Sequence, residues 1–556
     1  HQMIHYICKY TPVEMLEAFG EPCIPLESLS DSYDRSDSCA HANLCGYGKS
    51  LIEAVLAGKV TELILVNCCD TIRRCYDVIK ADGKCRFLFM LDLPHETGSC
   101  SITYYAEELK RLYTAYTEYC GKSWISSDFG RLSRVPSAYS LLNPPKGPYI
   151  GLLGAHSGTQ LCRYIQSKTD LPVRNLTCTG NRTVDLHSLC GNNSIGDGTF
   201  FTAYAAELLR QIPCQRMNDT AGRRTLWNDP ALRGIIYLTI KFCDYYGAEY
   251  AAIRDSISVP LLKIESDYTM QSEGQLSTRI EAFAETLRGN TVKKSDTSDK
   301  NYFAGLDSGS TSTDVVIIDR NCRIVSQSII ATGAGAEKGA QKCLRLALDE
   351  AHLNYDDIAN VVTTGYGREY IKTGDESITE ISCHAKGAHF LDPSVHTVID
   401  IGGQDSKVIV LNNDGSVANF VMNDKCAAGT GRFIEAMARA LGLSLDEISA
   451  LGLSCGEDIT ISSMCTVFAE SEVVSLVAQN KSVNDIVYGL DKSVAAKIGA
   501  LASRLHTQNE WMMTGGVAQN RGIVKALESR LGIKLRISDK AQLCGALGAA
   551  LYAAGK

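Results

Sequence analysis

The chain has 556 residues, of which 45% are hydrophobic and 21% charged, and its formal net charge at pH 7 is −8. This length exceeds one hydrophobic core and predicts roughly three to four domains. An acidic chain without a basic tract argues against nucleic acid as a partner. No apolar run reaches the roughly 18 residues that a membrane-spanning helix needs. With no leader pattern at its start, the sequence predicts a cytoplasmic protein without a membrane partner.

Cysteine is the anomaly of the composition, with 22 residues. Fifteen precede Lys300, seven follow it, and none forms a C-x-x-C pair, which removes the usual support for zinc-ribbon and thioredoxin-like sites. Scattered thiols that a fold brings together are typical of iron–sulfur clusters, whereas a buried thiol can also pack as a small apolar side chain. Apolar or turn surroundings favour the packing role for Cys8, Cys23, Cys322, Cys343 and Cys544.

Two polar segments divide the chain. Residues 288–300 (RGNTVKKSDTSDK) are charged and lack apolar periodicity, which predicts a flexible linker at 289–300. Residues 143–148 (NPPKGP) contain proline pairs that exclude a helix or a strand interior. The predicted parts are therefore 3–145, 146–288 and 301–556.

Short apolar strands alternate with amphipathic helices in the first two parts. Strands are predicted at 62–68, 86–94, 149–155, 234–240 and 260–266, with a helix at 104–116. This rhythm predicts two flavodoxin- or Rossmann-like parallel sheets with covering helices. Functional groups in such folds gather at the carboxyl ends of the strands, which is where the pattern places Cys68, Cys69 and Cys243.

The third part begins differently, with three consecutive strands at 302–307, 312–319 and 322–330. A helix at 336–351 and a strand with a glycine turn at 361–368 follow. The strand–turn–strand pattern recurs over 396–423, where a D-G turn joins two strands. The pattern therefore indicates an internal duplication.

Each copy has an aspartate before a glycine turn, Asp307 in LDSGST and Asp400 in IDIGGQD. Glycine lets backbone N–H groups approach phosphate, and the aspartates can hold Mg²⁺ or orient water. A third glycine pair, in MTGGVAQN, has room for an adenosine. The alternative is three unrelated hairpin turns. Predicted ATP or ADP contacts are Asp307, Gly309, Ser310, Thr311, Ser312, Gly402, Gly403, Asp405, Gly515, Gly516 and Gln519, and the predicted catalytic residues are Asp400 and Gln404.

In this order, the three turns resemble the phosphate-one, phosphate-two and adenosine signatures of the actin, hexokinase and heat-shock chaperone superfamily. The resemblance implies an ATPase with duplicated ribonuclease-H-like subdomains. Two thiols are added to this pattern: Cys426 in NDKCAAGTGRF and Cys465 in SSMCTVFAESEV each precede a predicted helix. A helix N-terminus stabilises a thiolate, and Lys425 adds positive charge. Because a 4Fe–4S cluster usually takes four cysteines, two from each of two copies predict a homodimer with the cluster on its axis.

Residues 302–556 also resemble the activators of 2-hydroxyacyl-CoA dehydratases, through SCHAKGAHF, VIDIGGQDSK, NDKCAAGTGRF, CTVFAESEV and MTGGVAQN. This resemblance implies that ATP hydrolysis moves the helices around the shared cluster and drives one low-potential electron into a partner. It also implies a ferredoxin or flavodoxin as electron donor. One departure is Asp314, which stands where many relatives carry a lysine.

Residues 3–288 resemble the iron–sulfur subunits that such activators serve: dehydratase subunits, benzoyl-CoA reductase subunits and double-cubane cluster proteins. The matching segments include YICKYTPVEMLEAFG, NLCGYGKSL, VNCCDTIRRCYD and KFCDYYGAEY. The resemblance implies that Cys45, Cys69 and Cys243 hold an iron–sulfur cluster.

Further thiols lie near these three. Cys39 and Cys75 lie close to the first two in sequence, and Cys214 stands where double-cubane relatives carry a cysteine. Six ligands would suit a double-cubane 8Fe–9S cluster, and three would suit one cubane with an open iron. Other thiols that can replace the second three are Cys68, Cys100, Cys120, Cys162, Cys178 and Cys190.

Three functions compete. The leading hypothesis is an ATP-dependent reductase, in which the C-terminal part passes electrons to the N-terminal cluster and a small molecule is reduced there. The second is a 2-hydroxyacyl-CoA dehydratase with a built-in activator, although such enzymes usually pair two different catalytic subunits. The third is a sugar-kinase-like ATPase, which has no use for thiols at helix starts.

Overall fold

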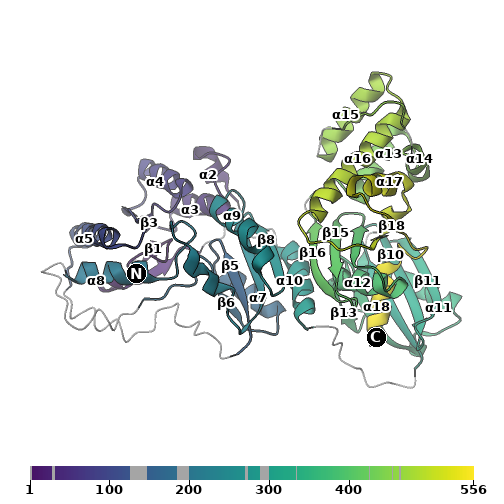
Figure 1. Cartoon of the computed structure of the whole chain (residues 1–556), viewed down its shortest axis with the longest axis horizontal. Coiled ribbons are helices and arrows are strands. Elements are labelled where there is room, and N and C mark those ends of the chain that lie inside the picture. Colours follow the sequence, from purple (N-terminus) through teal and green to yellow (C-terminus); the bar gives the residue numbers. More distant parts are fainter. Residues whose placement is uncertain are drawn as a thin grey trace. The chain divides into compact units, whose positions relative to one another are not determined.

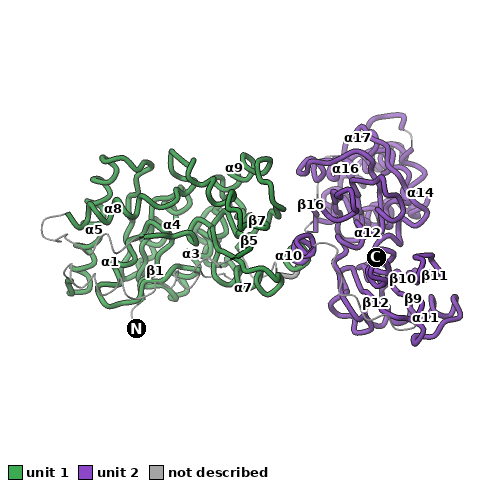
Figure 2. The backbone as a smooth tube through the Cα atoms, turned by 60° about the horizontal axis from the view of Figure 1, so that its bottom comes forward, with its two compact units in different colours: residues 1–280 green, residues 281–556 purple. Residues whose placement is uncertain are grey.

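The computed structural model describes residues 3–27, 32–124, 147–184, 199–268, 273–288, 300–333, 335–424, 426–453, 455–461 and 465–556. The chain divides into two compact units, residues 1–280 and 281–556 (Figure 2). Cys190, Lys425 and residues 289–299 of the predicted linker lie outside the described residues. Within the described ranges, no helix combines the length and the apolar character needed to cross a bilayer.

The first unit opens with a sheet of four parallel strands in the order β2-β1-β3-β4. The strands are β1 (Ile4–Tyr6), β2 (Cys23–Pro25), β3 (Glu62–Val66) and β4 (Phe87–Leu91). The helices are α1 (Val13–Glu17), α2 (Asp34–Cys39), α3 (Gly46–Leu56), α4 (Asp70–Asp82) and α5 (Ser99–Cys120). Every residue of β3 is buried, as expected for a strand that helices cover on both faces.

A second parallel sheet of the same unit repeats this order as β6-β5-β7-β8. Its strands are β5 (Tyr149–Gly154), β6 (Val173–Asn175), β7 (Leu232–Ile240) and β8 (Leu261–Ser266). The helices that follow along the chain are α7 (Thr159–Lys168), α8 (Thr199–Arg210), α9 (Asp244–Ile253) and α10 (Glu273–Arg288). Of these, α8 packs against α5 in the core of the first sheet, and α10 from residue 281 onward groups with the second unit. The order is that of flavodoxin-like sheets, whose ligands bind beyond the carboxyl ends of the first and third strands. Both predicted parallel sheets are confirmed.

The second unit contains two five-stranded sheets of one topology, β11-β10-β9-β12-β13 and β16-β15-β14-β17-β18. The first holds β9 (Tyr302–Ser308), β10 (Ser312–Asp319), β11 (Ile324–Ala331), β12 (Ile358–Thr364) and β13 (Glu376–Ser377). The second holds β14 (Thr397–Ile401), β15 (Ser406–Leu411), β16 (Val417–Asn423), β17 (Trp511–Thr514) and β18 (Leu535–Arg536). In each, three antiparallel strands are extended by two parallel ones. The predicted duplication is confirmed.

The helices of this unit divide into two groups. They are α11 (Ala336–Glu350), α12 (Glu380–Leu391), α13 (Gly431–Leu441), α14 (Leu445–Leu451), α15 (Thr466–Ala478), α16 (Val483–Ala502), α17 (Arg521–Leu531) and α18 (Cys544–Ala553). Helices α13 to α17 lie together, with α15 at their outer end (Figure 1). Helix α18 is buried along its whole length and packs closely on β9, where a Cβ on Gly305 would lie 1.9 Å from the Ala546 carbonyl oxygen.

Candidate nucleotide and cluster sites

A cavity of about 360 Å³ opens in the second unit and is lined by residues from both duplicated halves. The residues that the sequence singled out for nucleotide binding and catalysis all line it: Asp307, Gly309, Ser310, Thr311, Ser312, Asp400, Gly402, Gly403, Gln404, Asp405, Gly515, Gly516 and Gln519. The two phosphate turns come close together, since a Cβ on Gly403 would lie 2.2 Å from the Thr311 hydroxyl oxygen. The fold thus joins segments that are far apart in the sequence.

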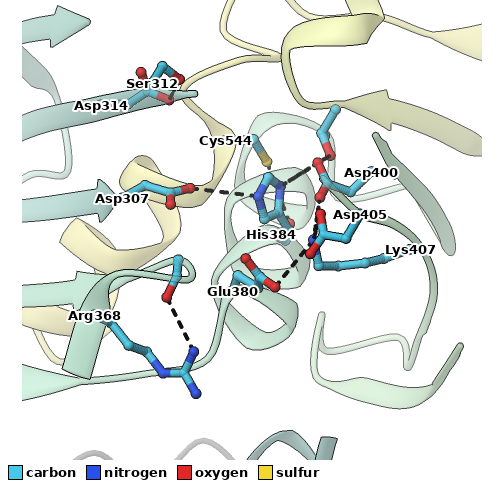
Figure 3. A network of polar contacts seen from close by, with 12 residues as sticks. Asp307, Ser312, Asp314, Arg368, Glu380, His384, Asp400, Asp405, Lys407 and Cys544 are labelled. Carbon is cyan, nitrogen blue, oxygen red and sulfur yellow. Dashed lines mark hydrogen bonds and ion pairs between the residues drawn. The ribbon is translucent and has the colours of Figure 1, made fainter. Parts of the chain in front are cut away.

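His384 of α12 lies between the two strand-end aspartates (Figure 3). Its Nδ1 is 3.4 Å from Asp400 Oδ1, and its Nε2 is 3.8 Å from Asp307 Oδ2. Thr514 completes the group, because its hydroxyl is 3.1 Å from the imidazole Nδ1 and donates to Asp400 Oδ1 at 3.1 Å. Burial lowers the pKa of His384, so the ring is neutral at pH 7. The ring is hydrogen-bonded to Thr514 of the second half and separates the carboxylates of Asp307 and Asp400.

Lys407 of β15 is a buried cation among three carboxylates. Its Nζ lies 2.8 Å from Asp405, 3.1 Å from Asp400 and 3.3 Å from Glu380. Although burial opposes the charged form, these carboxylates raise the pKa of Lys407 well above its usual value. Burial would raise the pKa of Asp400 too, but His384 and Lys407 together lower it. Asp400 is therefore ionised at neutral pH.

The opposite shift occurs at Asp307. Burial, followed by the charges of Asp314 and Asp400, raises the pKa of Asp307 to about 8. Burial raises the pKa of Asp314 to about 7, and burial also raises that of Glu380 to about 8. An excess of carboxyl groups beside one ammonium favours a divalent cation, because Mg²⁺ is bound through carboxylates together with substrate phosphates.

Other contacts connect the phosphate turn of the second half to α13. The N–H groups of Gly431 and Arg432 donate to the carbonyl oxygens of Gly402 and Gly403 at 2.8 and 2.9 Å. With its amide oxygen turned toward Arg432, Gln404 accepts bonds of 2.7 and 3.0 Å from that guanidinium. At the far end, the Gln519 amide donates to Gln542 Oε1 at 3.0 Å. A shift of the turn would therefore displace the start of α13.

The two C-terminal thiols differ in setting, and the helix-start prediction is wrong for Cys426. Cys465 is the N-cap residue of α15, as the sequence predicts. Helix α13 instead begins at Gly431 with Thr430 as its N-cap, because residues 427–430 form a turn. Cys426 is partly buried against the core of this half and lies outside the first turn of α13, where a helix dipole acts most strongly.

Helix α15 leaves an apolar surface exposed beside Cys465. Val467 and Phe468 retain 67% and 68% of their accessible surface, and Val474 and Val477 of the same helix are also exposed. Single exposed apolar residues are ordinary, whereas a contiguous set marks an interaction surface.

In the first unit, the three thiols that the resemblance singled out are all N-cap residues. Cys45 caps α3, Cys69 caps α4 and Cys243 caps α9. A hydrogen bond from the Cys68 thiol lowers the pKa of Cys69 to about 7, and N–H groups of the first turn of α4 add to this effect. Burial, followed by the charges of Cys45 and Cys69, raises the pKa of Cys243 to about 11. The three thiols therefore share one neighbourhood.

The other predicted ligands fall into two places. Cys75 is fully buried next to Gly48, where a Cβ would lie 3.2 Å from Cys75 Sγ and 3.8 Å from Cys45 Sγ. Cys39 is exposed at the end of α2, and its charge contributes to the raised pKa of Cys75.

Cys214 lies with a second group of thiols, which adjoins the first because Cys68 is hydrogen-bonded to Cys69 and Cys178 interacts electrostatically with Cys243. The backbone N–H of Cys214 donates to the Tyr10 hydroxyl at 3.2 Å. Cys8 interacts with it electrostatically, and burial together with that charge raises the pKa of the Cys8 thiol to about 12. Cys178 and Cys68 are also coupled to Cys214. Cys8, which the sequence assigned to packing, therefore lies among the thiols of this second group.

An iron–sulfur cluster is the cofactor that the sequence resemblance implies for these thiols. Across the described ranges, no three His, Cys, Asp or Glu side chains converge as they would around a single metal ion. A cluster holds its thiolates around a larger body than one ion. Three thiols at separate helix starts, with glycine at position 48 between Cys45 and Cys75, fit a cluster.

A duplicated core that brings an aspartate and a glycine turn from each half to one cavity is the architecture of the actin- and hexokinase-like ATPases. Residues 304–553 match the BadF/BadG/BcrA/BcrD ATPase family, and the chain belongs to that family. Residues 8–131 and 140–287 match the 2-hydroxyglutaryl-CoA dehydratase, D-component, family.

Several relatives of this chain are dehydratase activators. The (R)-2-hydroxyglutaryl-CoA dehydratase activating ATPase of Acidaminococcus fermentans is 46% identical over 253 residues, which are 45% of this chain and 96% of that protein. The 2-hydroxyisocaproyl-CoA dehydratase activator of Clostridioides difficile is 44% identical over 252 residues, 45% of this chain and 94% of that protein. The crystal structure of component A of the former dehydratase is similar with a TM-score of 0.45 and covers 46% of this chain and 98% of that one.

Sequence reasoning missed three residues that shape the cavity: Glu380, His384 and Lys407. All three lie in or beside segments that carried the family resemblance, SCHAKGAHF and IGGQDSK. Their role could not be predicted, because α12 reaches the cavity only through the packing between the two halves, and Lys407 meets Asp400 only through the register of β14 and β15.

Proposed function

We propose that this chain is an ATP-driven iron–sulfur reductase with its activator built in. ATP binding and hydrolysis in the second unit would drive low-potential electron transfer from a shared 4Fe–4S cluster to a cluster in the first unit, where a small molecule is reduced. One observation carries this proposal: a single chain combines a member of an ATPase family with a match to a dehydratase component. The proposed parts are 3–145, 146–288, a linker at 289–300, and 301–556.

The cavity residues divide into three proposed roles. Backbone N–H groups of Gly309, Gly402 and Gly403, with the hydroxyls of Ser310 and Thr311, hold the phosphates. Asp307 and Asp400 hold Mg²⁺ or its water ligands, supported by Asp405. Gln404 orients the attacking water, and Gly515, Gly516 and Gln519 hold the adenosine. The two pKa shifts support this division. The lowered pKa of Asp400 keeps it ionised, and the raised pKa of Asp307 means that a bound cation would favour its ionised form.

The path from nucleotide to thiols is proposed to run through α13. Its first N–H groups bond to the carbonyl oxygens of Gly402 and Gly403, and its preceding segment carries Cys426. Cys465 starts the neighbouring helix α15. A small shift of the phosphate turn would thus be passed on to both thiols.

Cys426 and Cys465 are proposed to hold half of a 4Fe–4S cluster, and a second copy of the chain the other half. The exposed apolar surface of α15 next to Cys465 supports a homodimer contact at this place. The cluster would supply one-electron chemistry at low potential. Its electron donor is proposed to be a ferredoxin or flavodoxin.

In the first unit, Cys45, Cys69 and Cys243 are proposed as the first ligand set. Their shared position at helix starts supports this assignment, because the N-terminal N–H groups stabilise thiolates. The second set of a double-cubane cluster would be Cys39, Cys75 and Cys214. Since Cys214 lies with Cys8, Cys68 and Cys178, these three are the alternatives that the arrangement favours.

A lyase is the second candidate. The relatives of the ATPase are named as activators of dehydratases, and the first unit matches a dehydratase component. In that case one cubane with three cysteine ligands would suffice, and an electron would only initiate each reaction.

Iron and acid-labile sulfide per chain, measured on anaerobically purified protein, test the proposal. About two irons per chain from the shared cluster and about eight from the first unit support the reductase. About two plus four support the dehydratase. An iron-free protein that still hydrolyses ATP would overturn both.

Single substitutions sharpen this test. Cys465→Ala and Cys426→Ala should remove about two irons per chain and leave ATP binding intact, because the thiols and the phosphate turns lie on separate segments. Cys455→Ala is the matched control, since Cys455 is also an exposed cysteine of this half. Loss of ATP binding with retained iron would contradict the assignment.

A further inference from the structure

Helix α10 contributes a partly buried carboxylate to the start of α12. Glu285 accepts hydrogen bonds from the Thr379 N–H at 3.0 Å, from the Thr379 hydroxyl, and from the Ser382 hydroxyl at 2.5 Å. Thr379 is the N-cap residue of α12. An acidic group at this end is favourable, because the first N–H groups of a helix are unpaired and carry positive partial charge.

A second carboxylate of α10, one turn earlier, fixes the turn that follows β12. Glu281 Oε2 accepts from Arg368 Nη2 at 2.6 Å, and only 4% of the arginine side chain is exposed. The same guanidinium donates from Nη1 to the Gly365 carbonyl oxygen at 3.2 Å. This is a partly buried, charge-assisted pair, which is stronger than an exposed one.

Both attachment points adjoin the nucleotide cavity. Helix α12 carries Glu380 and His384, which line the cavity, and Glu380 follows the Thr379 cap directly. Gly365 packs against Asp307, since a Cβ there would lie 2.3 Å from Asp307 Oδ1. Glu285 and Glu281 therefore hold the two elements that flank the strand-end aspartate of the first half.

This helix is not part of the ATPase family match, which begins at residue 304. The match to the dehydratase component runs to residue 287 and includes both glutamates. Yet residues 281–288 group with the second compact unit. The activator relatives match over 252 and 253 residues of this chain, which are 94% and 96% of their own lengths.

We propose that the last two turns of α10 belong to the nucleotide site. Glu285 and Glu281 are positioning residues that hold α12 and the 365–368 turn. Nucleotide binding in turn stabilises α10. The inference rests on the proposed ATPase function. Because coupling between two sites is reciprocal, a dehydratase-like segment would sense the nucleotide through these two carboxylates.

Hydrogen exchange of the full-length chain tests the coupling, first in the wild-type protein and then in substituted variants. Saturating Mg²⁺–ADP should slow amide exchange of residues 281–288 by roughly fivefold or more, the lower range of allosteric coupling. Glu285→Gln and Glu285→Ala should reduce or abolish this protection. The matched control is Glu376→Ala, at an exposed glutamate of β13 in the same half, which should retain it.

Steady-state ATP hydrolysis gives a second, independent readout. Glu285→Ala should lower kcat by about tenfold with a smaller change in KM, because α12 supplies groups to the phosphate end of the cavity and none to Gly515 or Gly516. Ser382→Ala removes one of the three hydrogen bonds and should show a weaker form of the same change. Ser382→Ala replaces Glu285→Ala as the test variant if Glu285→Ala does not fold.

Two results would overturn the inference in distinguishable ways. If Mg²⁺–ADP binds and exchange of residues 281–288 stays unchanged, the coupling is absent while the ATPase proposal stands. If the wild-type chain binds neither ATP nor ADP, the proposed function fails and the inference fails with it.

Discussion

The two halves of the ATPase unit share one topology but place side chains of opposite charge beside their strand-end aspartates. In the first sheet, Asp307 pairs across the ladder with Asp314 on one side and Thr364 on the other. In the second, Asp400 pairs with Lys407 and Thr514 at the same positions. The glycines that follow the two threonines, Gly365 and Gly515, even share a φ of +84°. The duplicated frame is thus preserved, and one charge is reversed.

This reversal separates the ionisation of the two aspartates. Lys407 and His384 lower the pKa of Asp400, while burial and Asp314 raise that of Asp307 to about 8. The second half carries its own counter-charge. Among the described residues of the first half, no such cation pairs with Asp307 across the sheet. Asp307 would therefore ionise fully only beside an added cation, such as the proposed Mg²⁺.

Removing the counter-charge of the second half should have the largest effect. Lys407→Met leaves Asp400, Asp405 and Glu380 without their cation, and breaking a buried ion pair costs about 3–5 kcal/mol. Urea unfolding measures this loss of stability, and ATP hydrolysis should be abolished. The control is Lys492→Met, whose partly exposed pair with Asp458 should contribute less than about 1 kcal/mol. Equal effects of the two substitutions would contradict the comparison.

Neutralising each aspartate should change stability in opposite directions. Asp400→Asn removes a carboxylate held by favourable contacts and should destabilise the nucleotide-free protein at pH 8. Asp307→Asn removes a carboxylate whose ionised form is disfavoured and should stabilise it. Both should slow ATP hydrolysis by about 100-fold, because each loses a group aimed at the phosphates. Melting temperatures with the same sign of change would show that the halves are equivalent.

A lysine at position 314 of the first half should make the ionisation of Asp307 depend less on Mg²⁺. Below about pH 8, protons compete with Mg²⁺ for Asp307 and Asp314, so the half-saturating Mg²⁺ concentration should rise as pH falls. In Asp314→Lys the new charge lowers the pKa of Asp307, and this pH dependence should flatten by up to about tenfold. Asp356→Lys, at an exposed aspartate, is the control. An unchanged dependence in Asp314→Lys would exclude the mechanism.

The smallest expected effect is the dependence of folding stability on pH. The folded-state pKa values of Asp307, Asp314 and Glu380 are raised to about 8, 7 and 8, so the folded chain holds protons that the unfolded chain has released above pH 4. Stability from these groups is therefore present at low pH and lost as pH rises toward 8. Between about pH 7 and 8 the nucleotide-free protein should melt at lower temperature as pH increases. A rise instead, or the same slope with saturating Mg²⁺–ADP, would contradict these shifts.

The N-terminal thiols show how far the sequence alone can go. Cys69 and Cys243 follow strands, and strand ends can be read from apolar runs, so their place at a sheet edge was predictable. The grouping of Cys214 with Cys8 was not. It depends on α8 and the segment after it returning to the end of β1, a contact between residues about 200 positions apart in the sequence.

The sequence by itself determined the parallel sheets, the duplicated ATPase core and the three glycine turns, because strand–turn chemistry depends on neighbouring residues. It placed Cys465 at a helix start for the same reason, and it misplaced Cys426, where a short turn intervenes. Only the tertiary structure decided that Lys407 faces Asp400 while Asp314 faces Asp307, that His384 lies between them, and that α10 caps α12. These depend on strand register and on helix packing between distant segments, which local spacing does not encode.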